Sequence, residues 1–139
     1  MVIKVKHSGT VKLTARKDTR RGDLFIAEAL KNIPFRIRRV YFINNLNNLS
    51  VIRGEHAHRK LSQVIFCLNG SFTLSLDDGT RKQSIRLNDR GVGVILGPKL
   101  WHAMSKFSKH CIFMVLASDY HKESDYIRDY DAFLRLIKR

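Results

Sequence analysis

Residues 53–58 read RGEHAH, a stretch in which two histidines stand one residue apart beside an arginine. Residues two apart in a β-strand point to the same side, so His56 and His58 can direct both imidazoles at one point. Such imidazoles either bind a metal ion or carry protons, because their ordinary pKa is close to neutrality. The guanidinium of Arg53 is suited to holding a phosphate group, and the alternative is a solvated loop arginine.

Two further polar residues extend this pattern. The spacing of His56 and His58 resembles the first cupin motif, in which two histidines are followed by a glutamate and then a glycine. Gln63 stands at the glutamate position, and GPKLWHAM (97–104) supplies His102 near the place of a third histidine. A neutral amide does not offset the charge of a divalent ion, so we expect proton transfer and no bound metal. A metal site, and exposed loop histidines without a role, are the alternatives.

Short apolar or alternating runs indicate which elements position these residues. Turn sequences such as LNGS and DDGT separate the runs, and the Asp-Gly pair predicts a tight hairpin. Many short strands at about ten-residue spacing are typical of a β-sandwich or barrel. The cupin-like motif narrows this to an all-β cupin barrel (double-stranded β-helix, or jelly roll). The predicted strands cover residues 2–6, 10–14, 24–28, 36–44, 63–68, 71–77, 82–87, 92–96 and 110–117.

The last part of the chain has a different periodicity. In ESDYIRDYDAFLRLIKR (123–139), apolar side chains recur at helical spacing and basic residues lie at the end. This pattern predicts a short amphipathic C-terminal helix, with Tyr126 and Tyr130 on the face that docks on the barrel. No repeat or linker interrupts the chain, so we expect a single cupin-like domain over residues 1–139.

Composition limits the partners. The chain of 139 residues has 26 Lys and Arg against 12 Asp and Glu, a net charge of +14, so it should attract polyanions. The basic residues are scattered, with dense groups only at 19–21 and 36–39, which favours a phosphorylated small molecule over nucleic acid or a membrane surface. No run approaches the ~18 apolar residues of a membrane span, and no signal core is present. With Cys67 and Cys111 inside apolar runs, we expect a cytoplasmic protein with reduced thiols.

Several blocks in the same order resemble the sugar 3,4-ketoisomerases, small WxcM-like cupins. The resemblance covers roughly residues 20 to 135 and includes NIPFRIRRVYFI (32–43), the RGEHAH block (53–79), GPKLWHAM (97–104) and MVLASDYHKESDYIRDYDAF (114–133). It implies an isomerase that moves the ketone of dTDP-4-keto-6-deoxyglucose from C4 to C3, in the synthesis of amino sugars for bacterial surface polysaccharide. It also implies no cofactor and a homodimer, in which the N-terminal strands can be exchanged.

The resemblance assigns roles to individual residues. His56 would be the base that removes the C3 proton, with His58 and His102 beside it to polarise oxygens or return the proton. Arg53 would hold the pyrophosphate. The remaining substrate-binding candidates are Tyr41 or Trp101 for stacking on thymine, Gln63 as a hydrogen-bonding partner, and Arg21 and Gly22 in a loop at the mouth of the site.

The Arg21-Gly22 pair is more similar to members that deliver the C4 hydroxyl axial, so we expect the galacto product, dTDP-3-keto-6-deoxygalactose. Packing or turn roles are the alternatives for Tyr41, Trp101 and the loop. Two other functions stay open. One is a non-catalytic cupin that binds nucleotide sugars, and the other is a metal-dependent cupin epimerase or dioxygenase.

Overall fold

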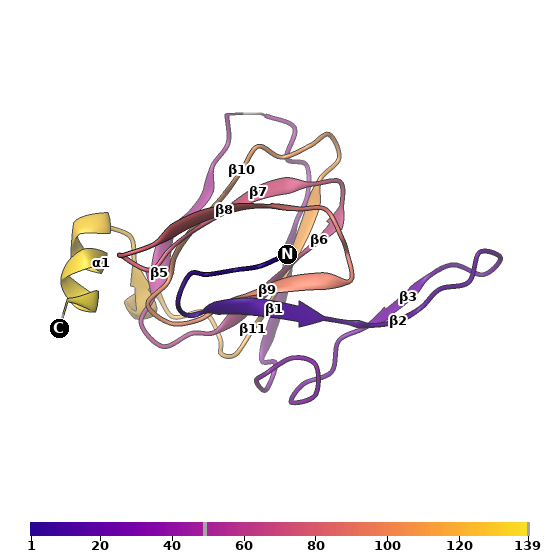
Figure 1. Ribbon diagram of the computed structural model, residues 1–139, viewed down its shortest axis with the longest axis horizontal. Helices are drawn as coiled ribbons and strands as arrows, with labels where there is room; N and C mark the ends of the chain where they lie inside the picture. Colours follow the sequence, from indigo (N-terminus) through magenta and orange to yellow (C-terminus); the bar gives the residue numbers. More distant parts are fainter. Residues whose placement is uncertain (49, 139) are drawn as a thin grey trace.

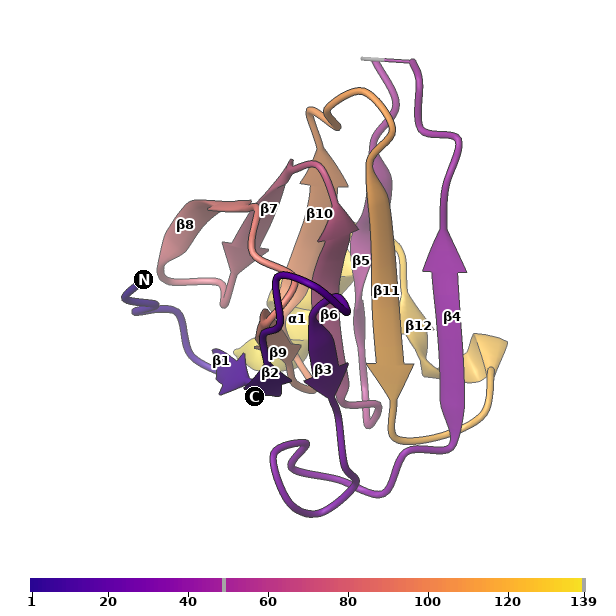
Figure 2. The same cartoon turned by 90° about the vertical axis from the view of Figure 1, so that its right-hand side faces the viewer.

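The computed structural model describes residues 1–48 and 50–138, which fold into two β-sheets that enclose a core, with a short helix at the C-terminal end (Figure 1 and Figure 2). The strands are β1 (Ser8–Lys12), β2 (Thr14–Arg16), β3 (Leu24–Ile26), β4 (Arg39–Ile43), β5 (Arg53–His58), β6 (Gln63–Asn69), β7 (Phe72–Asp77), β8 (Lys82–Leu87), β9 (Val92–Leu96), β10 (Trp101–Ser105), β11 (Ile112–Ala117) and β12 (Tyr126–Ile127). The 3₁₀-helix η1 spans Glu123–Asp125, and the helix α1 spans Tyr130–Ile137.

The strands form two five-stranded sheets and one hairpin. The first sheet has the order β1-β9-β6-β11-β4, and the second has the order β12-β5-β10-β7-β8. Strands β2 and β3 form a separate hairpin, which projects away from the barrel in Figure 1. The predicted all-β cupin-type fold with a short C-terminal helix is therefore confirmed.

Side chains from alternate positions along the strands fill the space between the sheets. Along β7, Phe72, Leu74 and Leu76 are buried, whereas Thr73 and Ser75 between them are partly exposed. Strands of the facing sheet contribute apolar side chains to the same core in the same way. Burial of one face of each strand is the main stabilising contribution, and it fixes the register, because a shift by one residue would turn every side chain over.

The predicted strands differ from the observed ones in two respects. The predicted strand over residues 2–6 is absent, because this segment is an irregular arm and β1 begins only at Ser8. Conversely, β5 and β10 were not among the predicted strands, although they carry all three clustered histidines. Their alternation is interrupted by polar residues and a bulge, so the apolar pattern alone did not reveal them.

The predicted C-terminal helix is shorter than expected. Residues 123–125 form η1, and β12 pairs Tyr126 with His58 and Ile127 with Ala57, so α1 begins only at Tyr130. Placing Tyr126 on the helix was therefore wrong, since strand pairing overrides a spacing that fits either element. Residue 139 of the predicted helix lies outside the described residues. None of the helices in the described ranges has the length and apolar character required to cross a bilayer.

The helix α1 docks on the outer face of the second sheet. The Asp129 side chain caps it by accepting a hydrogen bond from the backbone N–H of Ala132 at 3.1 Å. Phe133 is buried against the sheet, and Ile137 lies over Gly79 in the β7–β8 turn. Gly79 has a φ of +91°, and a Cβ there would collide with Ile137, so both the turn and the docking need glycine.

Candidate active site

Three imidazoles meet between the sheets because β5 and β10 are paired. His102 lies directly opposite His56, and its ring centroid is 4.8 Å from that of His56. His58, two residues along β5, faces the same side, with its ring centroid 4.9 Å from that of His56. One nitrogen from each of the three rings lies within 4.8 Å of the others. The convergence predicted from RGEHAH and GPKLWHAM is therefore present in the structure.

A bulge in β5 brings Arg53 to the same side as the histidines. The pairing of β5 with β10 shifts between His102 and Ala103, so that Arg53 lies opposite Met104, which lines the core. Gly54 adopts a φ of +83° at the bulge, and a Cβ there would be 3.0 Å from the carbonyl oxygen of His102. The bulge adds one residue to β5 relative to β10. Without this added residue, Arg53 would face the opposite side of the strand from His56.

Burial keeps the histidines neutral. Desolvation is the largest cause of the lowered pKa of all three, bringing the pKa of His58 to about 4 and that of His102 to about 3. The side chains of His58 and His102 are each only 2% exposed. Each charged imidazole would also repel the others. At pH 7 the cluster therefore consists of neutral imidazoles that can accept a proton.

Backbone carbonyls orient two of these rings. Nδ1 of His56 lies 3.1 Å from the carbonyl oxygen of Gly54, and Nδ1 of His102 lies 3.2 Å from that of Leu100. A carbonyl oxygen can only accept, so a neutral ring in this contact carries its proton on Nδ1. The other nitrogen, Nε2, is then unprotonated and available as a base or a ligand.

A cavity of about 530 Å³ opens beside His56. Its walls come from the first sheet, from β5 and β10, and from the segment after β11, and they carry three arginines, which suits an anionic ligand. Tyr41 lines it, and its hydroxyl accepts a hydrogen bond from Nε2 of the buried Gln63 at 3.2 Å. The lining residues are Arg39, Tyr41, Ile43, Ile52, Arg53, Gly54, His56, Met104, Phe113, His121, Tyr126 and Arg128.

Tyr126 is a member of the site that the sequence analysis assigned to the wrong element. Its ring centroid lies 4.5 Å from that of His58 and 5.0 Å from that of His56. The guanidinium of Arg128 lies 4.2 Å above the Tyr126 ring and forms hydrogen bonds of 2.9 and 3.0 Å to the carboxylate of Glu123. The DYIRDYD block contains Tyr126, but the helical spacing of its apolar residues led to the prediction of a helix in place of the short strand β12.

Three predicted site residues do not join this cluster within the chain. Trp101 alternates with His102 along β10, so it faces outward, where it packs on Tyr130 and Phe133 with centroid distances of 5.2 and 5.6 Å. Arg21 and Gly22 lie in the turn of the projecting β2–β3 hairpin. The Arg21 side chain is 88% exposed, and its Nε lies 2.8 Å from the Asp18 carboxylate.

The histidine cluster has the donors for a metal ion but no carboxylate among them. Three imidazoles can hold Zn²⁺ when a water molecule completes the shell. Within residues 1–48 and 50–138, His56, His58 and His102 are the group of His, Cys, Asp and Glu side chains placed to share one ion. These residues would hold such an ion, which would supply Lewis-acid polarisation of a sugar oxygen.

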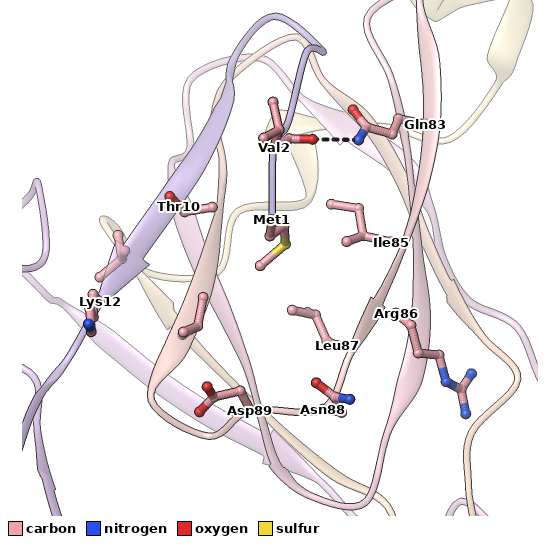
Figure 3. Close-up of a pocket in the computed structure, with 12 residues that line it drawn as sticks. Met1, Val2, Thr10, Lys12, Gln83, Ile85, Arg86, Leu87, Asn88 and Asp89 are labelled. Carbon is pink, nitrogen blue, oxygen red and sulfur yellow. Dashed lines mark hydrogen bonds between the residues drawn. The ribbon is translucent and has the colours of Figure 1, made fainter.

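A second cavity, of about 610 Å³, lies between the N-terminal arm and β8 (Figure 3). The side-chain amide of Gln83 donates a 2.8 Å hydrogen bond to the carbonyl oxygen of Val2 at its edge, and Ile85 and Leu87 face into it. Although it is larger, its lining includes no histidine or tyrosine. The cavity beside His56, where histidines, a tyrosine and arginines lie together, is therefore the candidate active site.

The fold and the site define the class of the protein, a small cupin-type β-barrel with a largely buried cluster of three histidines. Over residues 6–138 the chain matches the family described as FdtA: WxcM-like, C-terminal, and it belongs to that family. The predicted relationship to the sugar 3,4-ketoisomerases is therefore confirmed.

Known proteins agree with this assignment. The chain is 51% identical over 119 residues, 86% of its length and 85% of the relative, to the TDP-4-oxo-6-deoxy-alpha-D-glucose-3,4-oxoisomerase of Aneurinibacillus thermoaerophilus. It superposes with a TM-score of 0.93 on QdtA, a sugar 3,4-ketoisomerase from Thermoanaerobacterium thermosaccharolyticum solved in complex with TDP (38% identity; 97% of each chain covered). A 3,4-ketoisomerase from Helicobacter canadensis superposes with a TM-score of 0.91 (39% identity; 98% of this chain and 100% of that chain covered).

Proposed function

We propose that this protein is a TDP-sugar 3,4-ketoisomerase that converts TDP-4-keto-6-deoxyglucose to its 3-keto isomer. The observation that supports this most directly is the convergence of three neutral imidazoles beside a cavity lined by arginines. The reaction moves protons and leaves the oxidation level of the sugar unchanged, so it needs bases but no redox partner. The relative from Aneurinibacillus thermoaerophilus is named as a 3,4-oxoisomerase of TDP-4-oxo-6-deoxy-alpha-D-glucose, which is this reaction.

In the proposed mechanism, Nε2 of His56 removes the proton from C3, which the neighbouring C4 carbonyl acidifies. The electrons of the C–H bond form a C3–C4 double bond, and the carbonyl oxygen becomes the oxyanion of an enediolate. The O3 proton moves to O4 and a proton is delivered to C4, which leaves the carbonyl at C3. His58, His102 and Tyr126 surround His56. The Tyr126 hydroxyl can donate a hydrogen bond to the oxyanion, and the imidazoles can relay protons between the sugar oxygens.

The nucleotide is proposed to bind in the arginine-lined part of the cavity. Arg53, brought to the histidine side of β5 by the bulge, and Arg39 line the cavity and can pair with the pyrophosphate oxygens. Tyr41 lines the same cavity and has the aromatic face needed to stack on thymine. Trp101 faces outward in this chain, so Tyr41 is the better candidate of the two.

The proposed product is the galacto isomer, TDP-3-keto-6-deoxygalactose, which would be consumed in the synthesis of surface polysaccharide. The same bases serve both C4 configurations, so the choice depends on the sugar's orientation and on the mouth residues. Arg21 is the candidate for this choice, and it can act only if the β2–β3 hairpin reaches an active site. NMR of the product distinguishes the galacto from the gluco configuration.

In a homodimer, the β2–β3 hairpin of one subunit could reach the active site of the other. Within the chain, β1 pairs with β9, whereas the β2–β3 hairpin beyond it is largely exposed. Strand β4 is an edge of the first sheet and exposes Val40 and Phe42 on its outer face, which a second subunit could cover. Light scattering should then give twice the 16.1 kDa of the chain, and a monomer at micromolar concentration contradicts the dimer.

The activity is tested with the purified protein and TDP-4-keto-6-deoxyglucose in deuterated water. We expect formation of the 3-keto isomer with deuterium incorporated at the exchanging carbon and an unchanged rate after treatment with a chelator. Binding of TDP without turnover or exchange would instead identify a nucleotide-sugar-binding protein. Loss of activity with the chelator and recovery with one divalent ion would identify a metalloenzyme.

A further inference from the structure

A carboxylate lies beside one of the three histidines. Oδ2 of Asp125 is 3.3 Å from Nδ1 of His58, and the Asp125 side chain is 16% exposed. Asp125 is the last residue of η1 and immediately precedes Tyr126, which faces the cluster. His58 thus differs from His56 and His102, whose Nδ1 atoms face neutral backbone carbonyls.

Backbone donors hold this carboxylate in place. The N–H groups of Lys60 and Leu61 donate to Oδ1 and Oδ2 of Asp125 at 2.9 and 3.2 Å, respectively. The backbone N–H of Arg59 donates to the carbonyl oxygen of Asp125 at 3.0 Å. These bonds tie η1 to the turn that follows β5. The carboxylate is therefore fixed relative to the strand that carries His58 and keeps lone pairs free for it.

The contact has a chemical consequence for His58. A carboxylate only accepts hydrogen bonds, so a neutral ring facing it is favoured with its proton on Nδ1 and its Nε2 unprotonated. The separation of 3.3 Å falls short of a well-aligned hydrogen bond, and the pairing is mainly electrostatic in this structure.

The other groups around His58 have different roles. His56 from the same strand and His102 from β10 turn their own Nδ1 atoms to backbone carbonyls. Arg39 from β4 lines the same pocket as His58 and only donates hydrogen bonds. Tyr126 from β12 contributes an aromatic ring and a hydroxyl. Asp125 is thus the group that favours the Nδ1–H tautomer of His58.

We propose that Asp125 is a positioning residue that holds His58 in the Nδ1–H tautomer, so that the bare Nε2 of His58 can accept the O3 proton and pass it to O4. This deepens the proposed function and rests on it. His56 then removes the C3 proton and, as the imidazolium, returns a proton to C4 after exchange with solvent, while Nε2 of His58 accepts the O3 proton and passes it to O4 and Asp125 retains its charge. His102, whose Nδ1 faces a carbonyl, likewise presents a bare Nε2, which can accept a hydrogen bond from a sugar hydroxyl.

The first test measures the tautomer in the unmodified protein. With ¹⁵N-labelled histidine, the NMR spectrum at pH 7 should show His58 protonated at Nδ1 and bare at Nε2, assigned by its loss in a His58→Gln variant. A His58 ring protonated at Nε2 overturns the proposal. This measurement does not depend on catalysis, so it stands even if the protein proves to have no isomerase activity.

The second test replaces the carboxylate. An Asp125→Asn variant can present N–H donors to Nδ1, which should shift His58 toward the Nε2–H tautomer. We expect kcat to fall roughly 10- to 100-fold or more with KM changed less than about threefold, as for outer partners that orient functional histidines. An Asp125→Glu variant should recover part of the loss. The matched control is Asp119→Asn, which removes an exposed carboxylate whose Oδ2 is 2.9 Å from Lys122.

A merely structural role has a different signature. In that case, Asp125→Asn would lower the melting temperature while kcat of the folded protein and the His58 tautomer stayed as in the unmodified protein. Unchanged kcat together with an unchanged tautomer overturns the proposal. If the variant does not fold, the ¹⁵N measurement on the unmodified protein decides the question alone.

Discussion

The space between the two sheets contains a polar end and an apolar end, although some of the same strands run through both. On β10, His102 lies in the polar cluster, whereas Met104, two residues along the same face, packs in the apolar core. At the apolar end, the Phe72 ring packs against those of Phe107 and Phe113 with centroid distances of 5.9 and 5.4 Å. Apolar packing stabilises the fold, whereas buried imidazoles cost solvation energy and are useful for chemistry.

The largest expected effect comes from the polar end. A His56→Asn variant should lose roughly 10²- to 10⁴-fold in kcat, because it lacks the base, while its free energy of unfolding at pH 7 changes by less than about 1 kcal/mol. The measurements are C3 proton exchange and urea unfolding. Unchanged exchange would transfer the role of base to His58 or His102.

The next effect comes from the apolar end and has the opposite character. Phe72 is fully buried, so a Phe72→Ala variant should lose about 3–5 kcal/mol of stability through lost burial and a cavity. The kcat of the fraction that remains folded should stay within about threefold of the unmodified value, since Phe72 does not line the cavity beside His56. A large fall in kcat at full folding would mean that the two ends are coupled.

A pH titration of stability separates the ends without mutation. Burial lowers the pKa of His58 to about 4 and that of His102 to about 3, from 6.5 for the free group. Below pH 6.5 the unfolded chain binds protons that the folded chain excludes. The free energy of unfolding should therefore be highest above pH 6.5 and fall by up to about 1.4 kcal/mol per pH unit for each histidine toward pH 4.

Urea unfolding at several pH values measures this slope. A His102→Gln variant is the matched control, because it removes one titrating group and should flatten the dependence. An equal slope in the two proteins would contradict the assignment of His102 as a buried neutral base.

The smallest expected effect concerns α1, outside both ends. The Tyr130 hydroxyl donates a hydrogen bond to the Asp77 carboxylate, and this bond raises the pKa of Tyr130 to about 12. A Tyr130→Phe variant should lose about 1–2 kcal/mol of stability, since it leaves Asp77 without this donor, and should keep full activity. Reduced activity with normal stability would instead connect the outer face of the second sheet to catalysis.

Local patterns in the sequence were sufficient for the fold class and for the histidine cluster. Alternation along β7 and β8 and the Asp-Gly turn between them gave that hairpin, because both depend on residues close in the chain. The one-residue spacing of His56 and His58 similarly fixed their common side. The cupin motif then led to the inclusion of His102, and the resemblance of several ordered blocks led to the family.

Tertiary structure decided the features that depend on pairing between distant segments. The bulge opposite β10 turned Arg53 inward, and pairing with β5 made Tyr126 part of the site. The Asp125 carboxylate reached His58 only through the turn after β5, across more than 60 residues of sequence. The reason is physical, because a periodicity describes which side of its own element a residue faces, whereas its neighbours are determined by the long-range packing of strands.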